Sequence, residues 1–265
     1  MLNRGDDIVV VEGLSKSYRV RNLERQAMVE NLLRWMFGLQ SRRREIRALN
    51  NVSFRVARGE SVAIVGGNGA GKSTLLKILA GIATPSSGKV EVRARVATQL
   101  SLGSGFHPYL TGRENIFLQG TILGMTNRQV RSLIPAIVEY AGLEEAVDRQ
   151  LWTYSSGMTA RLGFAIAAHV QFELLLLDEA LSAGDHAFRD RCTETLLKFR
   201  ASGATMIMVS HGSENLRLLC DRGIWLDRGE IRAIGPASEI LDRYEESVGG
   251  QNEFETEFED RSARG

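Results

Sequence analysis

The chain has 265 residues, of which 43% are hydrophobic and 25% charged, and its formal net charge is +1. This much apolar surface excludes a largely disordered chain, and the balanced charge does not indicate a protein that wraps nucleic acid. Neither a signal peptide nor a run of about 18 apolar residues is visible, and Cys192 and Cys220 are expected to be reduced thiols in the cytosol.

In chain order, short β-branched runs alternate with helical patterns, which predicts an α/β fold with a parallel sheet covered by helices. The predicted strands span residues 8–11, 51–56, 61–65, 174–177, 205–209 and 223–226. A helix is expected over 72–80 and ends before Gly81. The turn Asp227-Arg228-Gly229 predicts a hairpin into a further strand over 230–234.

Residues from about 99 to 170 carry mostly helical signal between two strands, which predicts a helical subdomain inserted into the sheet domain. Thr111 with Glu114, and Thr126 with Gln129, each fit a capping box that opens a helix. We therefore expect one domain over 1–248 that contains this subdomain.

Two segments differ from the rest in composition. Residues 19–47 hold eight arginines and three glutamates, with apolar residues at helical spacing, which predicts a basic amphipathic helix. Its apolar stripe can pack on the chain's own sheet, or the helix can lie at a membrane surface and guide an anionic polymer. Residues 249–265 are acidic and lack a core pattern, so a solvated tail is expected.

The strand predicted at 61–65 runs into a stretch that matches the phosphate-binding pattern G-x-x-x-x-G-K-[ST]. Glycines let the backbone turn so that successive N–H groups face phosphate oxygens, and the next helix adds its positive N-terminal end. Lys72 is predicted to reach the β and γ phosphates of ATP, and Ser73 to bind Mg²⁺. The predicted nucleotide-binding residues in this stretch are Gly66, Gly67, Asn68, Gly69, Ala70, Gly71, Lys72, Ser73 and Thr74.

A buried apolar strand that ends in two carboxylates forms the second motif. The strand over 174–177 is followed by Asp178 and Glu179, at the sheet edge where open α/β folds bind ligands. Asp178 is predicted to hold Mg²⁺, and Glu179 to polarise the attacking water.

A third motif, Tyr154-Ser155-Ser156-Gly157-Met158, opens a helix before the second motif. It resembles the signature motif of ABC ATPases, usually Leu-Ser-Gly-Gly-Gln, and keeps a hydroxyl and a backbone N–H at a helix N-terminus. Further stretches resemble the D-loop and the switch histidine of the same family: Ser182-Ala183-Gly184-Asp185 and Val209-Ser210-His211.

This resemblance covers residues 18 to about 247 and implies an ABC-type P-loop ATPase fold with a mixed sheet core, an N-terminal antiparallel β part and the helical subdomain. It implies that Tyr18 stacks on adenine and that His211 and Asp185 act with Glu179 in catalysis. It also implies nucleotide contacts from Ser155, Ser156, Gly157 and Met158. Leu102 stands where these ATPases usually place a glutamine that binds Mg²⁺, and Gln99 is the candidate in its place.

Three features resemble the ATPase subunits of polysaccharide exporters, which move O-antigen, capsule or teichoic-acid polymers. They are the insertion over 19–47, the stretch over 102–115, and the signature followed by Arg161-Leu162-Gly163-Phe164. Residues 249–265 are too few for the carbohydrate-binding domain that some of these exporters carry. Recognition of the polysaccharide is therefore expected mainly in a permease.

The resemblance implies a homodimer in which the signature of one subunit closes over the ATP held by the other. It also implies a separate multispanning permease, two copies of each subunit, and a peripheral position at the cytoplasmic face of the membrane. One alternative is an ABC ATPase for another substrate, such as a lipid or drug. A soluble ABC ATPase acting on DNA or the ribosome is a further alternative, although neither a long coiled coil nor a second fused ATPase domain is visible. A P-loop kinase would leave the signature and the switch histidine unexplained.

Overall fold

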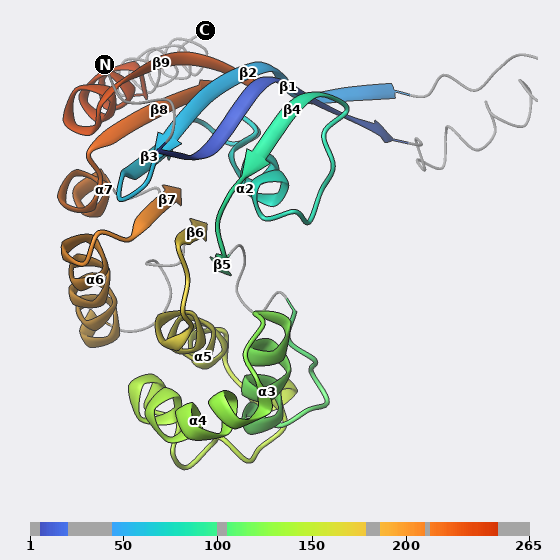
Figure 1. The fold of residues 1–265 in the computed structure, drawn as a ribbon, viewed down its shortest axis with the longest axis vertical. Coiled ribbons are helices and arrows are strands. Elements are labelled where there is room, and N and C mark those ends of the chain that lie inside the picture. The colour runs from blue at the N-terminus through green and yellow to red at the C-terminus, as the bar shows by residue number, and fades with distance from the viewer. Residues whose placement is uncertain (1–5, 21–43, 100–104, 179–185, 210–212, 249–265) are drawn as a thin grey trace, which may run out of the picture.

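A computed structural model describes residues 6–20, 44–99, 105–178, 186–209 and 213–248 of the chain. Two sheets lie one above the other with helices around them, and the helices α3 (Gly112–Ile122), α4 (Asn127–Ala141) and α5 (Ser156–His169) gather at one end (Figure 1). None of the described helices is long and apolar enough to cross a membrane.

The larger sheet carries the predicted parallel strands. Its six strands lie in the order β5-β6-β7-β3-β8-β9, and the pair β8–β9 at one edge is antiparallel. The strands are β3 (Ser61–Val65), β5 (Val96–Gln99), β6 (Leu174–Asp178), β7 (Thr205–Val209), β8 (Arg222–Asp227) and β9 (Glu230–Pro236). Both β3 and β7 are buried at every position, as expected for central strands covered on both faces.

The hairpin predicted after β8 is confirmed. Arg228 and Gly229 both have positive φ, 47° and 84°, as the two central residues of a type I′ turn require. The strands that flank this turn, β8 and β9, pair in antiparallel register.

The smaller sheet is antiparallel, with the order β2-β1-β4 and the strands β1 (Asp7–Val20), β2 (Arg44–Ala57) and β4 (Ser87–Val92). Strands β1 and β2 are longer than predicted, and Val20 lies opposite Arg44 at their far end. The prediction of a helix over 19–47 is therefore wrong at both ends, because β pairing already satisfies the backbone groups there. Residues 21–43, in the middle of that segment, lie outside the described residues, as do 249–265.

The described helices with assigned bounds are α2 (Lys72–Leu79), α3 (Gly112–Ile122), α4 (Asn127–Ala141), α5 (Ser156–His169), α6 (His186–Ala201) and α7 (Ser213–Leu219). A short 3₁₀ helix, η1 (Leu151–Thr153), precedes α5, and residues 237–248 form a further helix. Both predicted capping boxes are confirmed, with Thr111 and Glu114 at α3 and Thr126 and Gln129 at α4.

Buried side chains form three clusters. The first lies between the two sheets and includes α2, and the second lies on the other face of the larger sheet, under α6, α7 and the helix over 237–248. The third joins α3, α4 and α5. Cys192 and Cys220 are buried free thiols in the second cluster, and burial raises the pKa of both.

Candidate active site

The carboxyl ends of neighbouring parallel strands bring two of the predicted motifs to one edge of the larger sheet. Strand β6 ends at Asp178, which pairs with Val209 of β7. The same Val209 pairs on its other side with Ile64 of β3, two residues before Gly66. Because adjacent strands lie about 4.8 Å apart, the start of the phosphate loop and Asp178 are separated by about 10 Å across the sheet.

The other predicted catalytic and metal-binding residues follow strands that end at this edge. Gln99 ends β5 opposite Leu177, although only its backbone is among the described atoms. Glu179 and Asp185 follow β6, and His211 follows β7 by two residues, but all three lie outside the described residues. All three come in the sequence shortly after strands that end at this edge, and their roles stay predictions.

The two ends of the phosphate loop are held by close backbone packing. A Cβ atom on Gly66 (φ +152°) would lie 2.1 Å from the carbonyl oxygen of Leu226, and one on Gly71 (φ +104°) would lie 2.4 Å from that of Ala48. Only glycine permits such approaches. Of the four residues between them, Gly67, Asn68 and Gly69 are exposed and Ala70 is buried, so the middle of the loop faces outward between two anchored ends.

Lys72 and Ser73 begin helix α2 directly after the loop. Lys72 is only 8% exposed, and its Nζ donates to the carbonyl oxygens of Gly66 at 2.7 Å and Gly67 at 3.1 Å. Its ammonium group therefore lies beside the first two residues of the loop, where it could contact the β and γ phosphates of a bound nucleotide. Ser73 is exposed, and a serine hydroxyl and a carboxylate such as that of Asp178 are oxygen ligands of the kind that Mg²⁺ prefers; their role as Mg²⁺ ligands stays a prediction.

The turn between β8 and β9 supports the phosphate loop, which the sequence analysis did not foresee. The Gly229 N–H donates to the carbonyl oxygen of Ala70 at 3.0 Å, and the Gly229 carbonyl accepts from the Asn50 N–H at 2.8 Å. This glycine joins the loop to strand β2 of the smaller sheet. The turn residues were predicted as a hairpin, but nothing local indicated what the hairpin would contact.

Tyr18 lies in β1 on the flank of the loop. It pairs with Ile46 of β2, and two residues further along β2 the carbonyl of Ala48 packs on Gly71. Tyr18 is 38% exposed, and Lys16 Nζ lies 5.0 Å from the centroid of its ring. An exposed ring beside the loop suits the predicted stacking on adenine, which stays a prediction.

The signature motif forms the N-terminus of α5. The Ser155 hydroxyl accepts a hydrogen bond from the Met158 N–H at 3.2 Å, and Ser155 and Ser156 are both exposed. The Ser155 hydroxyl thus caps the helix and keeps its own proton for donation.

Tyr154 has a structural role where the family usually has leucine. Its hydroxyl donates to the carbonyl oxygen of Ala146 at 2.7 Å, and burial raises its pKa. The hydroxyl also lies over Gly112, where a Cβ would be 2.3 Å from it. Tyr154 therefore fixes the motif to the segment that precedes it and to the start of α3.

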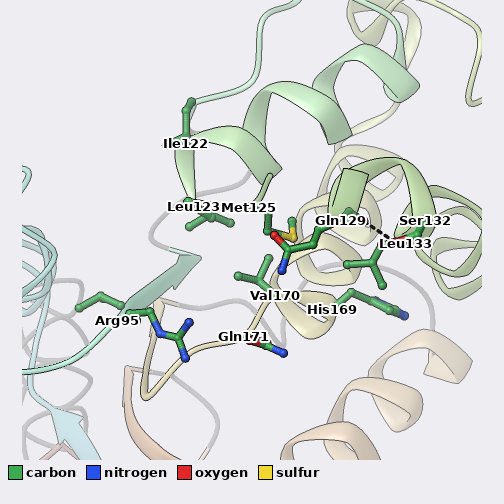
Figure 2. Close-up of a pocket in the computed structure, with 12 residues that line it drawn as sticks. Arg95, Ile122, Leu123, Met125, Gln129, Ser132, Leu133, His169, Val170 and Gln171 are labelled. Carbon is green, nitrogen blue, oxygen red and sulfur yellow. Dashed lines mark hydrogen bonds between the residues drawn. The ribbon is translucent and has the colours of Figure 1, made fainter. Parts of the chain in front are cut away.

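A pocket of about 570 Å³ lies elsewhere, at the amino-terminal side of β5 and the C-terminal end of α5 (Figure 2). Its lining residues are Arg95, Val96, Ile122, Leu123, Gly124, Met125, Gln129, Ser132, Leu133, His169, Val170 and Gln171. None of these is a predicted site residue. The candidate active site is therefore defined by the strand ends and the phosphate loop.

Known proteins resemble this chain in sequence and in fold. A family model described as "ABC transporter" matches residues 49–182. The O-antigen export system ATP-binding protein RfbB of Klebsiella pneumoniae is 42% identical over 205 residues, 77% of this chain and 83% of that protein. The teichoic acids export ATP-binding protein TagH of Bacillus anthracis is 39% identical over 210 residues, 79% of this chain but only 38% of that protein.

A solved structure shares the fold. It is a dimeric ATP-binding cassette in a post-hydrolysis state, bound to ADP and phosphate, and it matches with a TM-score of 0.70 and 22% identity. The match covers 86% of this chain and 98% of the other.

Proposed function

Because this chain belongs to the ABC transporter family, we propose that it is the ATP-hydrolysing subunit of an exporter that moves a lipid-linked polysaccharide. The observation that carries the catalytic part is the meeting of the phosphate loop and Asp178 at one edge of a parallel sheet. This is where open α/β folds bind their ligands.

In this proposal, backbone N–H groups of the loop and the N-terminus of α2 bind the β and γ phosphates of ATP. Lys72 supplies a positive charge there from a nearly buried position. Ser73 and Asp178 would hold Mg²⁺, which would supply positive charge against the negative charge developing on the phosphate oxygens. Glu179 orients the attacking water, and His211 assists it from the end of the neighbouring strand.

We further propose a homodimer with two head-to-tail sites. The signature at the N-terminus of α5 and the loop before α2 belong to different parts of the molecule, with α5 among the gathered helices and α2 beneath the smaller sheet (Figure 1). The exposed Ser155 and Ser156 are then placed to meet the nucleotide of a second copy. The two copies would act on a separate permease from the cytoplasmic face of the membrane.

The polysaccharide substrate is supported by sequence features and by relatives. The insertion over 19–47 and the signature variant resemble those of polysaccharide exporters, and proteins named for O-antigen and teichoic-acid export are 42% and 39% identical. We propose that the permease provides most of the contacts with the polymer.

Steady-state hydrolysis of MgATP by the purified full chain tests the catalytic assignment. Glu179→Gln should keep the affinity for ATP and lower kcat about 100-fold or more, because the general base is lost. Lys72→Ala should weaken ATP binding, whereas Lys77→Ala, an exposed lysine in the same helix, should not. Hydrolysis by Glu179→Gln within a few-fold of the wild type would contradict the assignment.

The substrate is tested in cells that lack this chain. Surface polysaccharide should disappear and return with the wild-type chain, but not with Glu179→Gln. Normal surface polysaccharide combined with a defect in export of a lipid or drug would instead favour another substrate.

A further inference from the structure

Tyr140 of α4 lies where three helices meet. Its ring centroid is 6.1 Å from that of Phe164 in α5, 5.6 Å from that of His169 at the end of α5, and 6.0 Å from that of Phe188 in α6. Tyr140 packs against both the buried cluster of α3–α5 and the cluster under the larger sheet. It therefore connects the gathered helices with the sheet core.

Polar contacts join the same tyrosine to α6. Its phenol oxygen lies 2.7 Å from Thr195 Oγ1 and 3.2 Å from the carbonyl oxygen of Arg191. The guanidinium of Arg191 lies 5.3 Å from the ring centroid, and its Nη1 donates to the Tyr140 carbonyl at 2.9 Å. Ring stacking, a cation–π contact and hydrogen bonds thus act together on one half-buried residue.

The two helices joined in this way begin at functionally assigned segments. Helix α5 begins directly after the signature residue Ser155, and α6 begins directly after residues 179–185, which hold the proposed catalytic Glu179 and Asp185. Phe164 and Phe188 also contact each other, with ring centroids 6.1 Å apart. Any shift of α5 relative to α6 would therefore displace the signature relative to the catalytic edge.

The environment suits a permanent, uncharged contact. Burial raises the pKa of Tyr140 from 10.0 to about 12, so its hydroxyl stays protonated well above neutral pH. Partial burial also strengthens the hydrogen bonds, because water competes less for the phenol oxygen.

We propose that Tyr140 is a positioning residue for ATP hydrolysis, holding α5 at a defined angle to α6 through Thr195 and Arg191. This inference rests on the proposed function, since it assumes that the signature of one subunit serves the nucleotide of the other. A tilted α5 would misplace the signature in turnover but leave the phosphate loop of the same chain intact. Loss of the contact should consequently lower kcat and leave the affinity for ATP unchanged.

The test removes single hydroxyl groups from the full chain. Tyr140→Phe keeps the ring and deletes the contacts of the phenol oxygen with Thr195 and with the Arg191 carbonyl. Thr195→Val deletes the contact with Tyr140 from the α6 side, together with the bond of Thr195 to the Arg191 carbonyl. Each should lower kcat about fivefold or more, with KM and the Kd of ATP within about twofold of the wild type. Because both variants break the Tyr140–Thr195 contact, the double variant should lose less activity than the two single losses combined.

Thr193→Val is the matched control. Thr193 lies in the same helix, and its hydroxyl makes the same bond to a backbone carbonyl four residues earlier, Arg189, as Thr195 makes to Arg191. No contact of Thr193 with Tyr140 is described. We expect Thr193→Val to change Tm as Thr195→Val does but to keep the wild-type kcat.

Three outcomes would overturn the inference, and the first two concern kcat: a kcat of Tyr140→Phe within twofold of the wild type, or an equal loss of kcat in Thr193→Val. If kcat and the affinity for ATP fell together with Tm, the role of Tyr140 would be purely structural, which also contradicts it. The proposed function is judged separately, by whether Glu179→Gln abolishes hydrolysis by the otherwise unchanged chain.

Discussion

The phosphate loop and the signature motif are held in place by different kinds of contact. Both ends of the loop meet backbone carbonyls, Gly66 that of Leu226 and Gly71 that of Ala48, at distances that leave no space for a Cβ. The signature is held by side chains, through the hydroxyls of Tyr154 and Ser155.

This difference explains why one motif is easy to recognise and the other is altered. Where backbone packs on backbone, only glycine fits, so the pattern of the loop tolerates little change. Where a side chain makes the contact, another residue can satisfy the same requirement by a different bond. Tyr154 does so in place of leucine, with a hydrogen bond to Ala146.

The largest effect is expected where the backbone packing is tightest. Gly66→Ala would push a methyl group to 2.1 Å from the Leu226 carbonyl oxygen, so the loop or β8 must move. We expect a loss of about 3 kcal/mol in the free energy of unfolding, or about 6–12 °C in Tm, measured without nucleotide. Gly67→Ala is the control, because nothing lies within 4 Å of that position. An equal Tm for the two variants would contradict the packing argument.

A smaller loss is expected at the turn that supports the loop. Gly229→Ala combines a positive φ of 84° with a Cβ only 2.8 Å from the Ala48 carbonyl oxygen. Gly203→Ala shares the strained conformation, with φ of 78°, but has open space around it. Gly229→Ala should therefore weaken ATP binding in a titration by about tenfold, equivalent to 1.4 kcal/mol, while Gly203→Ala binds ATP like the wild type. Equal affinities in the two variants would show that the turn does not support the loop.

Substitution at the signature motif should have a smaller effect than substitution at the phosphate loop or at the turn that supports it. Tyr154→Phe removes one of the two hydrogen bonds to the Ala146 carbonyl, which keeps the Arg149 N–H as a donor at 2.9 Å, so we expect a loss of about 1 kcal/mol in stability. The affinity for ATP should stay unchanged while kcat decreases, because α5 loses an anchor and the phosphate loop does not. Tyr109→Phe, at a residue 70% exposed, serves as control for removal of a tyrosine hydroxyl. A weaker affinity for ATP in Tyr154→Phe alone would mean that the two regions are not independent.

The smallest effect concerns the ion pair beside the signature segment. Arg113 binds both carboxylate oxygens of Asp148, at 2.7 and 3.0 Å, and thereby lowers the pKa of that carboxyl. Because the pKa of Asp148 is lower in the folded chain than its ordinary value of 3.8, the ion pair stabilises the fold at pH values above 3.8. This stability is lost as the pH falls through the lowered pKa. Arg113→Gln should thus reduce Tm slightly at pH 7, because the pair is exposed, and should reduce it less at pH 3. A Tm difference that is the same at both pH values would exclude the ion pair as its cause.

The sequence by itself determined the elements whose pattern is local. The strands at 61–65 and 205–209 match the structure, and the capping boxes at Thr111 and Thr126 form as expected. Hydrophobic periodicity, glycine turns and caps depend on neighbours within a few residues, so they can be read along the chain. The phosphate loop belongs to this group, since its glycines, lysine and serine are contiguous.

The tertiary structure alone decided the contacts between distant segments. Nothing near Gly229 in the chain indicated that it would donate to Ala70, and nothing near Tyr140 indicated Thr195 or Arg191. The ends of the segment at 19–47 show the same limit: local spacing predicted helix, but pairing of β1 with β2 gave their backbone groups partners in a sheet. Such choices depend on which surfaces meet when the chain folds, and non-local pairing overrides a weak local preference.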